Sequence, residues 1–278
     1  MQNSKTLYVT DLDGTFLNRE SKVSTASASL INSLIQEHDI NFTVATARTP
    51  ATVVPLLKEI EMRLPSVVMT GAALWNHSKE DYEEMSELSF PQVKEICHLF
   101  DEEEINPFVY MRNGNFLDVS HVENMTSPEQ KFFDERKFSP FKNFILDSTP
   151  SLSKAALIFA TDNLTRLKHL HKRIIDSVDC EAICYRDIFS ETNGYLEIYA
   201  PKVSKAHAIK HLSERIGADR IVVFGDNLND ISMMKIATHS IAVGNAYNEV
   251  KEAADEVIGD NYQDSVARWI EKDVLSGL

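Results

Sequence analysis

Long apolar runs, cysteines and positive charge are scarce in this chain of 278 residues, and each scarcity excludes a class of protein. No apolar run approaches the roughly 18 residues that a membrane-spanning helix needs, and the N-terminal residues show no signal-peptide core. The three cysteines are too few for a disulfide framework and fit free thiols in a reducing compartment, so we expect a cytoplasmic protein. Acidic residues number 42 against 28 basic ones, and the net charge of −14 argues against general affinity for nucleic acid or anionic membrane.

Several common catalytic motifs are missing as well. The sequence contains no Walker A motif and no Gly-x-Gly-x-x-Gly, so ATP-grasping and dinucleotide sites are not expected. No Gly-x-Ser-x-Gly marks a serine hydrolase. His207 and His211 have the spacing of a zinc pair on a helix, but no Glu stands beside His207 and no third ligand is evident. We expect these histidines to flank the core.

Two aspartates, Asp11 and Asp13, directly follow a β-rich run near the start of the chain. Gly14 comes next and allows the backbone to turn sharply. Open α/β sheets bind their ligands at the carboxyl ends of such strands. Two clustered carboxylates are unfavourable unless a cation or proton is shared, and Mg²⁺ prefers oxygen ligands. The pair is therefore a candidate metal site, although a solvated turn explains it equally well when it is taken alone.

Strand and helix signals alternate at both ends of the chain. The runs 40–45, 66–69 and 221–224 are apolar and β-rich, and stretches with helical periodicity separate the strands. This alternation is typical of a parallel sheet with right-handed crossovers. We predict an α/β core that comprises residues 1–78 and 192–278.

The middle of the chain has another character. Its start is polar and acidic, and Asn113-Gly114-Asn115 indicates a β-hairpin between helical stretches. Ser127 and Asp162 are expected to cap two of its helices. We predict an inserted α+β domain over residues 79–191.

Polar side chains follow three further elements of the predicted core. Thr46 and Arg48 come after one strand, Asp226 and Asp230 come after another, and Lys205 stands at a helix start. Two buried strands that each end in carboxylates are better explained by one shared metal than by coincidence. A lysine at a helix N-terminus opposes the helix dipole, and a bound anion would remove that conflict.

In their order along the chain, these motifs resemble those of the haloacid dehalogenase superfamily. Asp-x-Asp-Gly-Thr, Thr-x-Arg, a helix-starting Lys and Gly-Asp-x-x-x-Asp occur in sequence, and the similarity is greatest to the Cof-type sugar-phosphatase branch, subfamily IIB. The resemblance implies a Rossmann-like core with a cap of the second type, C2, inserted between Thr46 and Lys205. It also implies a Mg²⁺-dependent phosphatase of small phosphorylated metabolites.

The resemblance assigns chemical roles. Asp11 would attack phosphorus and form an aspartyl-phosphate, and Asp13 would protonate the leaving alkoxide and then deprotonate water. Mg²⁺ would bind to Asp11, the Asp13 carbonyl and Asp226. The remaining implied site residues are Leu12, Thr46, Ala47, Lys205 and Asn229 for the phosphoryl oxygens, and Asp230, Asn227 and Arg48 in support.

Four residues depart from the pattern of the branch. Ala47, Ala206 and Ser265 each replace a Gly, and Thr70 replaces an Asn. None of these changes removes a catalytic side chain, so they bear on geometry and rate more than on reaction type.

Other functions remain open. One is a phosphomutase or a nucleotide or flavin-precursor phosphatase on the same fold. Another is a weakly catalytic protein that binds and senses a phosphorylated metabolite, against which the intact Asp11 and Asp13 argue. A monomer and a homodimer are both compatible with the sequence. Substrate selection is expected in the cap, where polarity and turn position suggest Tyr110, Arg112, Asn113, Arg186 and Asn193.

Overall fold

The computed structural model describes residues 5–147, 153–187 and 190–276. The chain forms two compact units, Met1–Glu83 with Ser204–Leu278, and Glu84–Val203. Within the described ranges, no helix is both long enough and apolar enough to cross a membrane.

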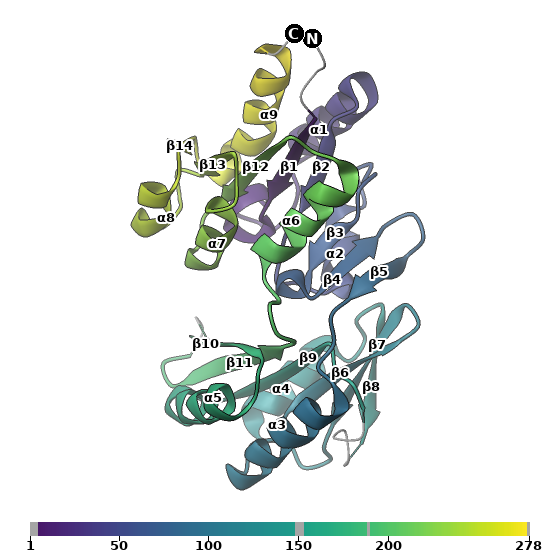
Figure 1. Ribbon diagram of the computed structural model, residues 1–278, viewed down its shortest axis with the longest axis vertical. Coiled ribbons are helices and arrows are strands. Elements are labelled where there is room, and N and C mark those ends of the chain that lie inside the picture. The colour runs from purple at the N-terminus through teal and green to yellow at the C-terminus, as the bar shows by residue number, and fades with distance from the viewer. Residues whose placement is uncertain (1–4, 148–152, 188–189, 277–278) are drawn as a thin grey trace. The chain divides into compact units, whose positions relative to one another are not determined.

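The first unit contains a five-stranded parallel sheet in the order β14-β13-β12-β1-β2 (Figure 1). All four pairings between neighbouring strands are parallel, as the sequence predicts. Strands β1, β2, β12 and β13 are buried along most of their length because helices cover both faces of the sheet. Their bounds are β1 Thr6–Thr10, β2 Asn41–Val44, β12 Arg220–Gly225, β13 His239–Ala242 and β14 Glu256–Val257.

Two groups of helices cover this sheet. Helices α1 and α9 pack against each other, and α6, α7 and α8 form a second contacting series. The N-terminus of α1 is capped by Ser24, whose hydroxyl accepts the Ser27 N–H, and Ser204 caps α6 in the same way through His207. The helix bounds are α1 Thr25–His38, α2 Pro50–Leu57, α6 Lys205–Ile216, α7 Ile231–Met234, α8 Asn248–Ala253 and α9 Ser265–Ser276.

A small sheet of three strands, β3 (Ser66–Val68), β4 (Ala73–Asn76) and β5 (Asp81–Met85), completes this region. Strand β3 pairs antiparallel with β4, and an isolated parallel bridge joins Ala45 to Val67. The strand predicted as the third of the parallel sheet therefore exists as β3, but it belongs to a separate small sheet.

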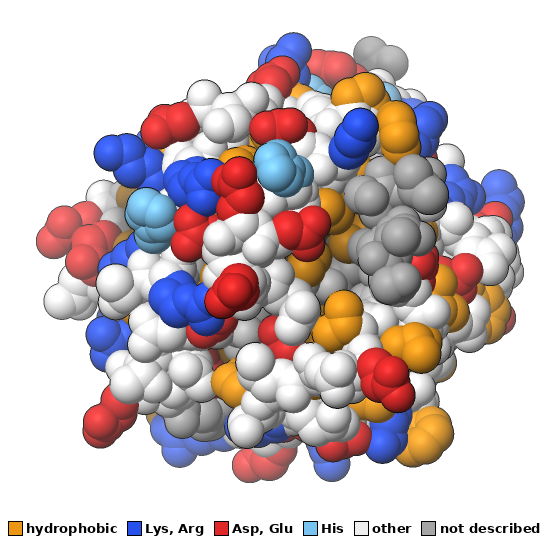
Figure 2. Space-filling view, turned by 90° about the horizontal axis from the view of Figure 1, so that it is seen from below, with side chains coloured by type: hydrophobic (Ala, Val, Ile, Leu, Met, Phe, Trp, Pro, Cys, Tyr) orange, Lys and Arg blue, Asp and Glu red, His pale blue; other side chains and the backbone are white. Residues whose placement is uncertain are grey.

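The second unit is an α+β layer with a six-stranded sheet in the order β10-β11-β9-β6-β7-β8. Its pairings are antiparallel except that of β7 with β8. On the face of the molecule seen in Figure 2, acidic and basic side chains are interspersed. The strand bounds are β6 Phe108–Asn113, β7 Phe116–His121, β8 Lys142–Leu146, β9 Leu157–Asn163, β10 Glu181–Arg186 and β11 Asn193–Tyr199.

Three helices flank this sheet. Helices α3 (Phe90–Glu102) and α5 (Leu164–Ser177) bury apolar side chains with Ile158 and Leu196 of the sheet. Helix α4 (Ser127–Arg136) packs through Phe132 on Phe108 and Phe159. The alternation along β9 sends Ile158 and Phe159 to opposite faces, so α4 lies on the face opposite α3 and α5.

The structure divides the chain at other positions than the sequence analysis did. Strand β5 begins after the predicted boundary between residues 78 and 79 and is hydrogen-bonded to β4, and the first unit extends to Glu83. The sequence predicts strand β11 (Asn193–Tyr199) in the core, but it pairs with β9 and β10 in the sheet of the second unit. The pattern of a buried strand does not specify which sheet it will join.

Candidate active site

Two neighbouring strands bring aspartates together at one edge of the parallel sheet. Thr10 and Phe224 are register partners on β1 and β12, and the next residues are Asp11 on one strand and Gly225 and Asp226 on the other. The Asp11 N–H donates to the Phe224 carbonyl at 3.0 Å. Carboxylate oxygens of Asp11, Asp226 and Asp230 all lie within 4.8 Å of one another. This arrangement confirms that the two acidic clusters of the sequence meet.

A tight turn after Asp11 fits against Asp226. Gly14 has a φ of +79°, and a Cβ at this position would lie 2.3 Å from an Asp226 carboxylate oxygen. Thr15 donates its hydroxyl to the Asp226 Oδ1 at 2.7 Å, and the Asn245 amide holds the Gly14 carbonyl at 2.7 Å. Only glycine therefore permits this close approach. Sequence reasoning quoted Thr15 as part of the motif but gave no role to it or to Asn245.

Lys205, the first residue of α6, lies between two of these carboxylates. Its ammonium is 2.5 Å from the Asp11 Oδ1 and 2.8 Å from the Asp230 Oδ1, and its side chain is only 2% exposed. The other oxygen of Asp230 accepts the backbone N–H groups of Asp226 and Asn227, both at 3.1 Å. Asp230 is thus fully engaged and holds Lys205 and the turn after β12 in place.

Burial governs the charge of the cluster. It raises the pKa of Asp11 to about 7, opposed by the Lys205 ammonium and supported by the Asp230 charge. Burial also raises the pKa of Asp226 to about 6, although the hydrogen bond from Thr15 lowers that pKa. Burial lowers the pKa of Lys205, but Asp11 and Asp230 together raise it further than burial lowers it. Three carboxylates and one ammonium leave an excess of negative charge that a hard divalent cation would neutralise.

Asp13 lies in a different environment from Asp11. Arg48 binds it in a bidentate manner, with Nε and Nη2 each 2.6 Å from a carboxylate oxygen. The Asp13 side chain is 51% exposed, whereas Asp11 is buried. A bidentate guanidinium fixes the orientation of a carboxylate as well as its position. Asp13 is accordingly a fixed carboxylate that solvent can reach.

The strand β2 delivers the residues of the Thr-x-Arg motif. Thr46 is buried and its hydroxyl accepts the Arg48 N–H at 3.2 Å. Ala47 is exposed and has a negative φ, and its N–H has no hydrogen-bond partner among the residues described. An alanine in place of glycine therefore still presents a free amide at this edge of the sheet.

The other predicted site residues differ in exposure and in their hydrogen bonds. Asn229 is exposed on the turn after β12, and Asn227 accepts the Leu228 N–H at 2.7 Å as the cap of that turn. The side chain of Leu12 is fully buried, so only its backbone can serve a ligand. Ser265 donates to the Asp260 carbonyl at 2.8 Å at the start of α9.

Thr70 has a φ of +58° and is 8% exposed. This is the left-handed region, which a β-branched residue rarely adopts.

The five polar residues suggested for substrate selection in the second unit differ in burial and in their contacts. Tyr110 is buried, Arg112 donates to the Gly114 carbonyl, and Asn113 donates to Asp118 within the hairpin. Arg186 is exposed at the end of β10. Asn193 lines a pocket in this unit.

Comparison with known proteins identifies the family of the chain. The family model of haloacid dehalogenase-like hydrolases matches residues 8–270. The chain belongs to this family. It is therefore an enzyme of a hydrolase family, and its fold is the haloacid dehalogenase core with a cap domain.

Two relatives that match this haloacid dehalogenase-like hydrolase along nearly its whole length are named as phosphatases. It is 25% identical over 268 residues to the pyridoxal phosphate phosphatase YbhA of Escherichia coli, with 94% of the chain and 95% of that protein covered. It is 26% identical over 276 residues to the 5-amino-6-(5-phospho-D-ribitylamino)uracil phosphatase YcsE of Bacillus subtilis, with 97% and 96% covered. The solved structure of the subclass IIB sugar phosphatase BT4131 shares the fold at a TM-score of 0.74 and 18% identity, with 99% and 100% covered.

Proposed function

We propose that the chain is a Mg²⁺-dependent phosphatase of small phosphorylated metabolites and that Asp11 is its nucleophile. The observation that carries this proposal is the position of Asp11, a buried carboxylate held by Lys205 and next to Asp226. The phosphatase names of relatives along nearly the whole chain support it.

The reaction would proceed in two steps. An Asp11 oxygen attacks phosphorus while the bond to the ester oxygen breaks, and Asp13 gives its proton to the leaving alkoxide. Asp13 then takes a proton from water, the water oxygen attacks the phosphoryl group, and the bond between phosphorus and Asp11 breaks. Inorganic phosphate leaves and both aspartates return to their starting states. Arg48 would hold Asp13 between the two proton transfers, when Asp13 is ionised, because a bidentate guanidinium binds a carboxylate through both oxygens.

The residues at the sheet edge fit a hard divalent cation. Asp11, the backbone carbonyl of Asp13 and Asp226 would hold Mg²⁺, and Asp230 would not, since Lys205 and two amides occupy its oxygens. When bound, Mg²⁺ would neutralise the charge of the carboxylates and of the phosphoryl group.

The phosphoryl oxygens would be held by groups around Asp11. Thr46, the free amide of Ala47, Lys205 and the exposed Asn229 would donate to them, together with the Leu12 backbone. Phosphoryl transfer requires this kind of positioning and charge neutralisation above all.

The names of the relatives suggest two kinds of substrate. One is a phosphorylated sugar or sugar-derived polyol, as in the ribitylaminouracil phosphatase, and the other is a cofactor ester such as pyridoxal phosphate. Both are small phosphate monoesters. The substrate of a flavin-precursor phosphatase, the alternative function, belongs to the same chemical class.

Phosphate release tests the proposal. A panel of sugar, polyol, nucleotide and pyridoxal phosphates is assayed with and without Mg²⁺, using wild type and Asp11→Asn. Asp176→Asn, an exposed aspartate at the end of α5, is the matched control. We expect Mg²⁺-dependent release by wild type and Asp176→Asn and none by Asp11→Asn. Release that persists in Asp11→Asn, or no release from any ester, would overturn the proposal.

A further inference from the structure

The loop that follows β13, residues 243–247, is hydrogen-bonded to both turns of the candidate active site. The side-chain amide of Asn245 donates to the Gly14 carbonyl, in the turn after β1, at 2.7 Å. The backbone N–H of Tyr247 donates to the Asp226 carbonyl, in the turn after β12, at 3.0 Å. One loop therefore joins the two segments whose carboxylates meet at the edge of the parallel sheet.

The hydrogen bond from Asn245 falls between two groups that are expected to hold the metal. The Asp13 carbonyl directly precedes Gly14, and Thr15 directly follows it and donates its hydroxyl to the Asp226 Oδ1 at 2.7 Å. Gly14 has a φ of +79° and a ψ of −8°, and a glycine has wider backbone freedom than any other residue. A hydrogen bond to the Gly14 carbonyl therefore restrains the path of the chain from one expected metal ligand to the partner of the other.

The Asn245 side chain is itself held in one orientation. Its Oδ1 accepts the backbone N–H of Asn261, in the short turn η5 (Asn261–Gln263), at 2.9 Å. The NH₂ group of the same amide consequently faces the Gly14 carbonyl. The Asn261 side chain in turn donates to the Leu17 carbonyl, just after the Gly14 turn, at 2.7 Å. The turn after β1 is thus connected to the β13 loop and to η5 at two points.

We propose that Asn245 is a positioning residue of the metal site, which holds the turn after β1 so that the Asp13 carbonyl and Asp226 can bind the same cation. This inference rests on the proposed function, which assigns Mg²⁺ to these groups. Asn245 acts on the metal through the Gly14 carbonyl and is not itself a ligand. Removal of a group that orients metal ligands typically weakens metal binding about 10- to 100-fold. Because Asn245 contributes a single hydrogen bond to the turn, we expect the lower end of this range.

Asn32 provides a matched comparison at a distance along the chain from the aspartates. This residue of α1 also uses both ends of its amide: it donates to the Glu59 carbonyl at 2.8 Å and accepts the Glu61 N–H at 2.8 Å. Both asparagines therefore connect separate backbone segments in the same way. If Asn245 only closed a loop, Asn245→Ala and Asn32→Ala would have the same consequences.

Calorimetric titration with Mg²⁺ in the absence of substrate tests the proposal. Wild type, Asn245→Ala and Asn32→Ala are compared at one pH, and urea denaturation without metal measures the stability of each. Asn245 is exposed, so its truncation opens no cavity and the variant should fold. We expect the Kd for Mg²⁺ to rise about tenfold in Asn245→Ala and to change less than about twofold in Asn32→Ala. Equal Mg²⁺ affinity of wild type and Asn245→Ala, or equal weakening in both variants, would overturn the proposal.

The dependence of turnover on Mg²⁺ gives a second readout. Hydrolysis of p-nitrophenyl phosphate is followed as the Mg²⁺ concentration increases. We expect Asn245→Ala to need about tenfold more Mg²⁺ for its half-maximal rate, and its kcat at saturating Mg²⁺ to remain within about threefold of wild type. A lower kcat that Mg²⁺ does not restore, with an unchanged half-saturating concentration, would contradict a role in positioning the metal ligands.

Failure of the proposed function is distinguishable from failure of this inference. If wild type binds Mg²⁺ but releases phosphate from no ester, the proposed phosphatase fails, and the calorimetric comparison still decides the role of Asn245. If wild type binds Mg²⁺ and Asn245→Ala binds it equally well, only the inference fails. If wild type binds no Mg²⁺, the assignment of the metal fails and the inference is overturned with it.

Discussion

At the scale of single residues, the site depends on two aspartates that are two positions apart and have opposite surroundings. Asp11 directly follows the buried strand β1 and is in contact with Lys205, whereas Asp13 lies within the turn after that strand and is half exposed beside Arg48. The sequence motif predicts both residues because their types and spacing are local properties. It does not predict the bidentate contact of Arg48, which depends on β2 lying beside β1.

Replacement of Arg48 tests its support of Asp13. We expect Arg48→Gln to lower kcat about tenfold on an alkyl phosphate with little change in KM, because Asp13 loses its fixed orientation. Arg48→Lys should not restore the rate, since an ammonium cannot bind both oxygens in the same plane.

Steady-state kinetics on a sugar phosphate and on p-nitrophenyl phosphate provide the measurement. The aryl leaving group needs less protonation, so its kcat should fall less. A rise in KM with unchanged kcat would show that Arg48 binds substrate instead.

The backbone of Thr70 offers a stability test. Its left-handed conformation is unfavourable for a β-branched residue and acceptable for asparagine, the residue common in the branch. We expect Thr70→Asn to raise the free energy of unfolding by about 1 kcal/mol in urea denaturation.

The matched control is Thr165→Asn, an exposed position in α5 with ordinary helical geometry, where no gain is expected. Equal or lower stability of Thr70→Asn would mean that contacts of the Thr70 side chain outweigh the backbone cost.

At the scale of elements, the site depends on where strands end and where α6 begins. Periodicity predicts the five core strands and most helices, because burial on one or both faces leaves a local pattern. Helix caps are displaced by one residue from the prediction: Thr126 and Asn163 cap α4 and α5, instead of Ser127 and Asp162. Each pair consists of adjacent residues that can both cap, so only the backbone path decides between them.

The start of α6 is positioned by a close approach to Gly71. This glycine has a φ of +100°, and a Cβ there would lie 2.2 Å from the Ser204 carbonyl oxygen. We expect Gly71→Ala to lower the free energy of unfolding by about 3 kcal/mol and to lower kcat, because α6 and Lys205 must shift.

Gly217→Ala serves as the comparison, since Gly217 has a φ of +65° but nothing within 4 Å of its added Cβ. It should cost only about 1 kcal/mol and leave kcat unchanged. Urea denaturation and kcat are measured for both variants. Equal costs would contradict the importance of the contact with Ser204.

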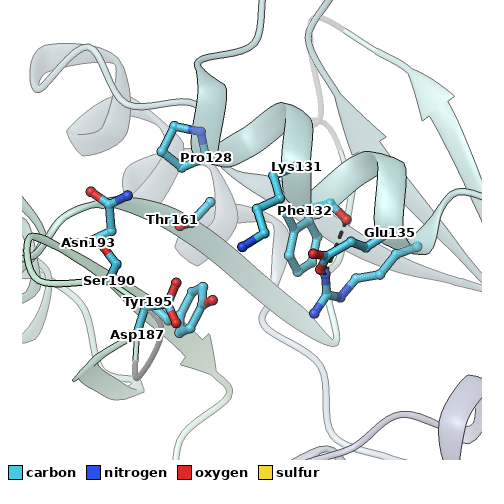
Figure 3. Close-up of a pocket in the computed structure, with 10 residues that line it drawn as sticks. Pro128, Lys131, Phe132, Glu135, Thr161, Asp187, Ser190, Asn193 and Tyr195 are labelled. Carbon is cyan, nitrogen blue, oxygen red and sulfur yellow. Dashed lines mark hydrogen bonds and ion pairs between the residues drawn. The ribbon is translucent and has the colours of Figure 1, made fainter.

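At the scale of the whole molecule, an acidic chain with a net charge of −14 also concentrates carboxylates at its site. Composition excludes broad classes of partner but does not identify a substrate. The pocket of the second unit is lined by side chains from α4, β9 and β11, which are distant in sequence and share no motif (Figure 3). That is why the reaction type follows from the sequence and the pocket does not.

The pH dependence of stability follows from the raised pKa values of Asp11 and Asp226, about 7 and about 6. In the absence of metal, the folded state binds more protons than the unfolded state above about pH 4, so stability should fall as pH rises toward 7. Mg²⁺ needs the ionised carboxylates, so the stabilisation that it gives should grow over the same range.

Thermal unfolding with and without Mg²⁺ at several pH values between about 5 and 8 measures this effect. We expect a larger rise in Tm on Mg²⁺ addition at the higher pH and no such rise in Asp226→Asn. A rise that is independent of pH would contradict the assignment of these carboxylates to the metal.

The central claim is that Asp11 carries the phosphoryl group during turnover. Asp13→Asn should still accept a phosphoryl group from p-nitrophenyl phosphate, whose leaving group needs little protonation, but should release it slowly. Acid quenching and peptide mass spectrometry then locate the modification. We predict one added phosphoryl group on the peptide that contains Asp11, absent when Asp11 is also replaced by Asn. A turnover that releases phosphate without this adduct, or an adduct at another residue, would contradict the account.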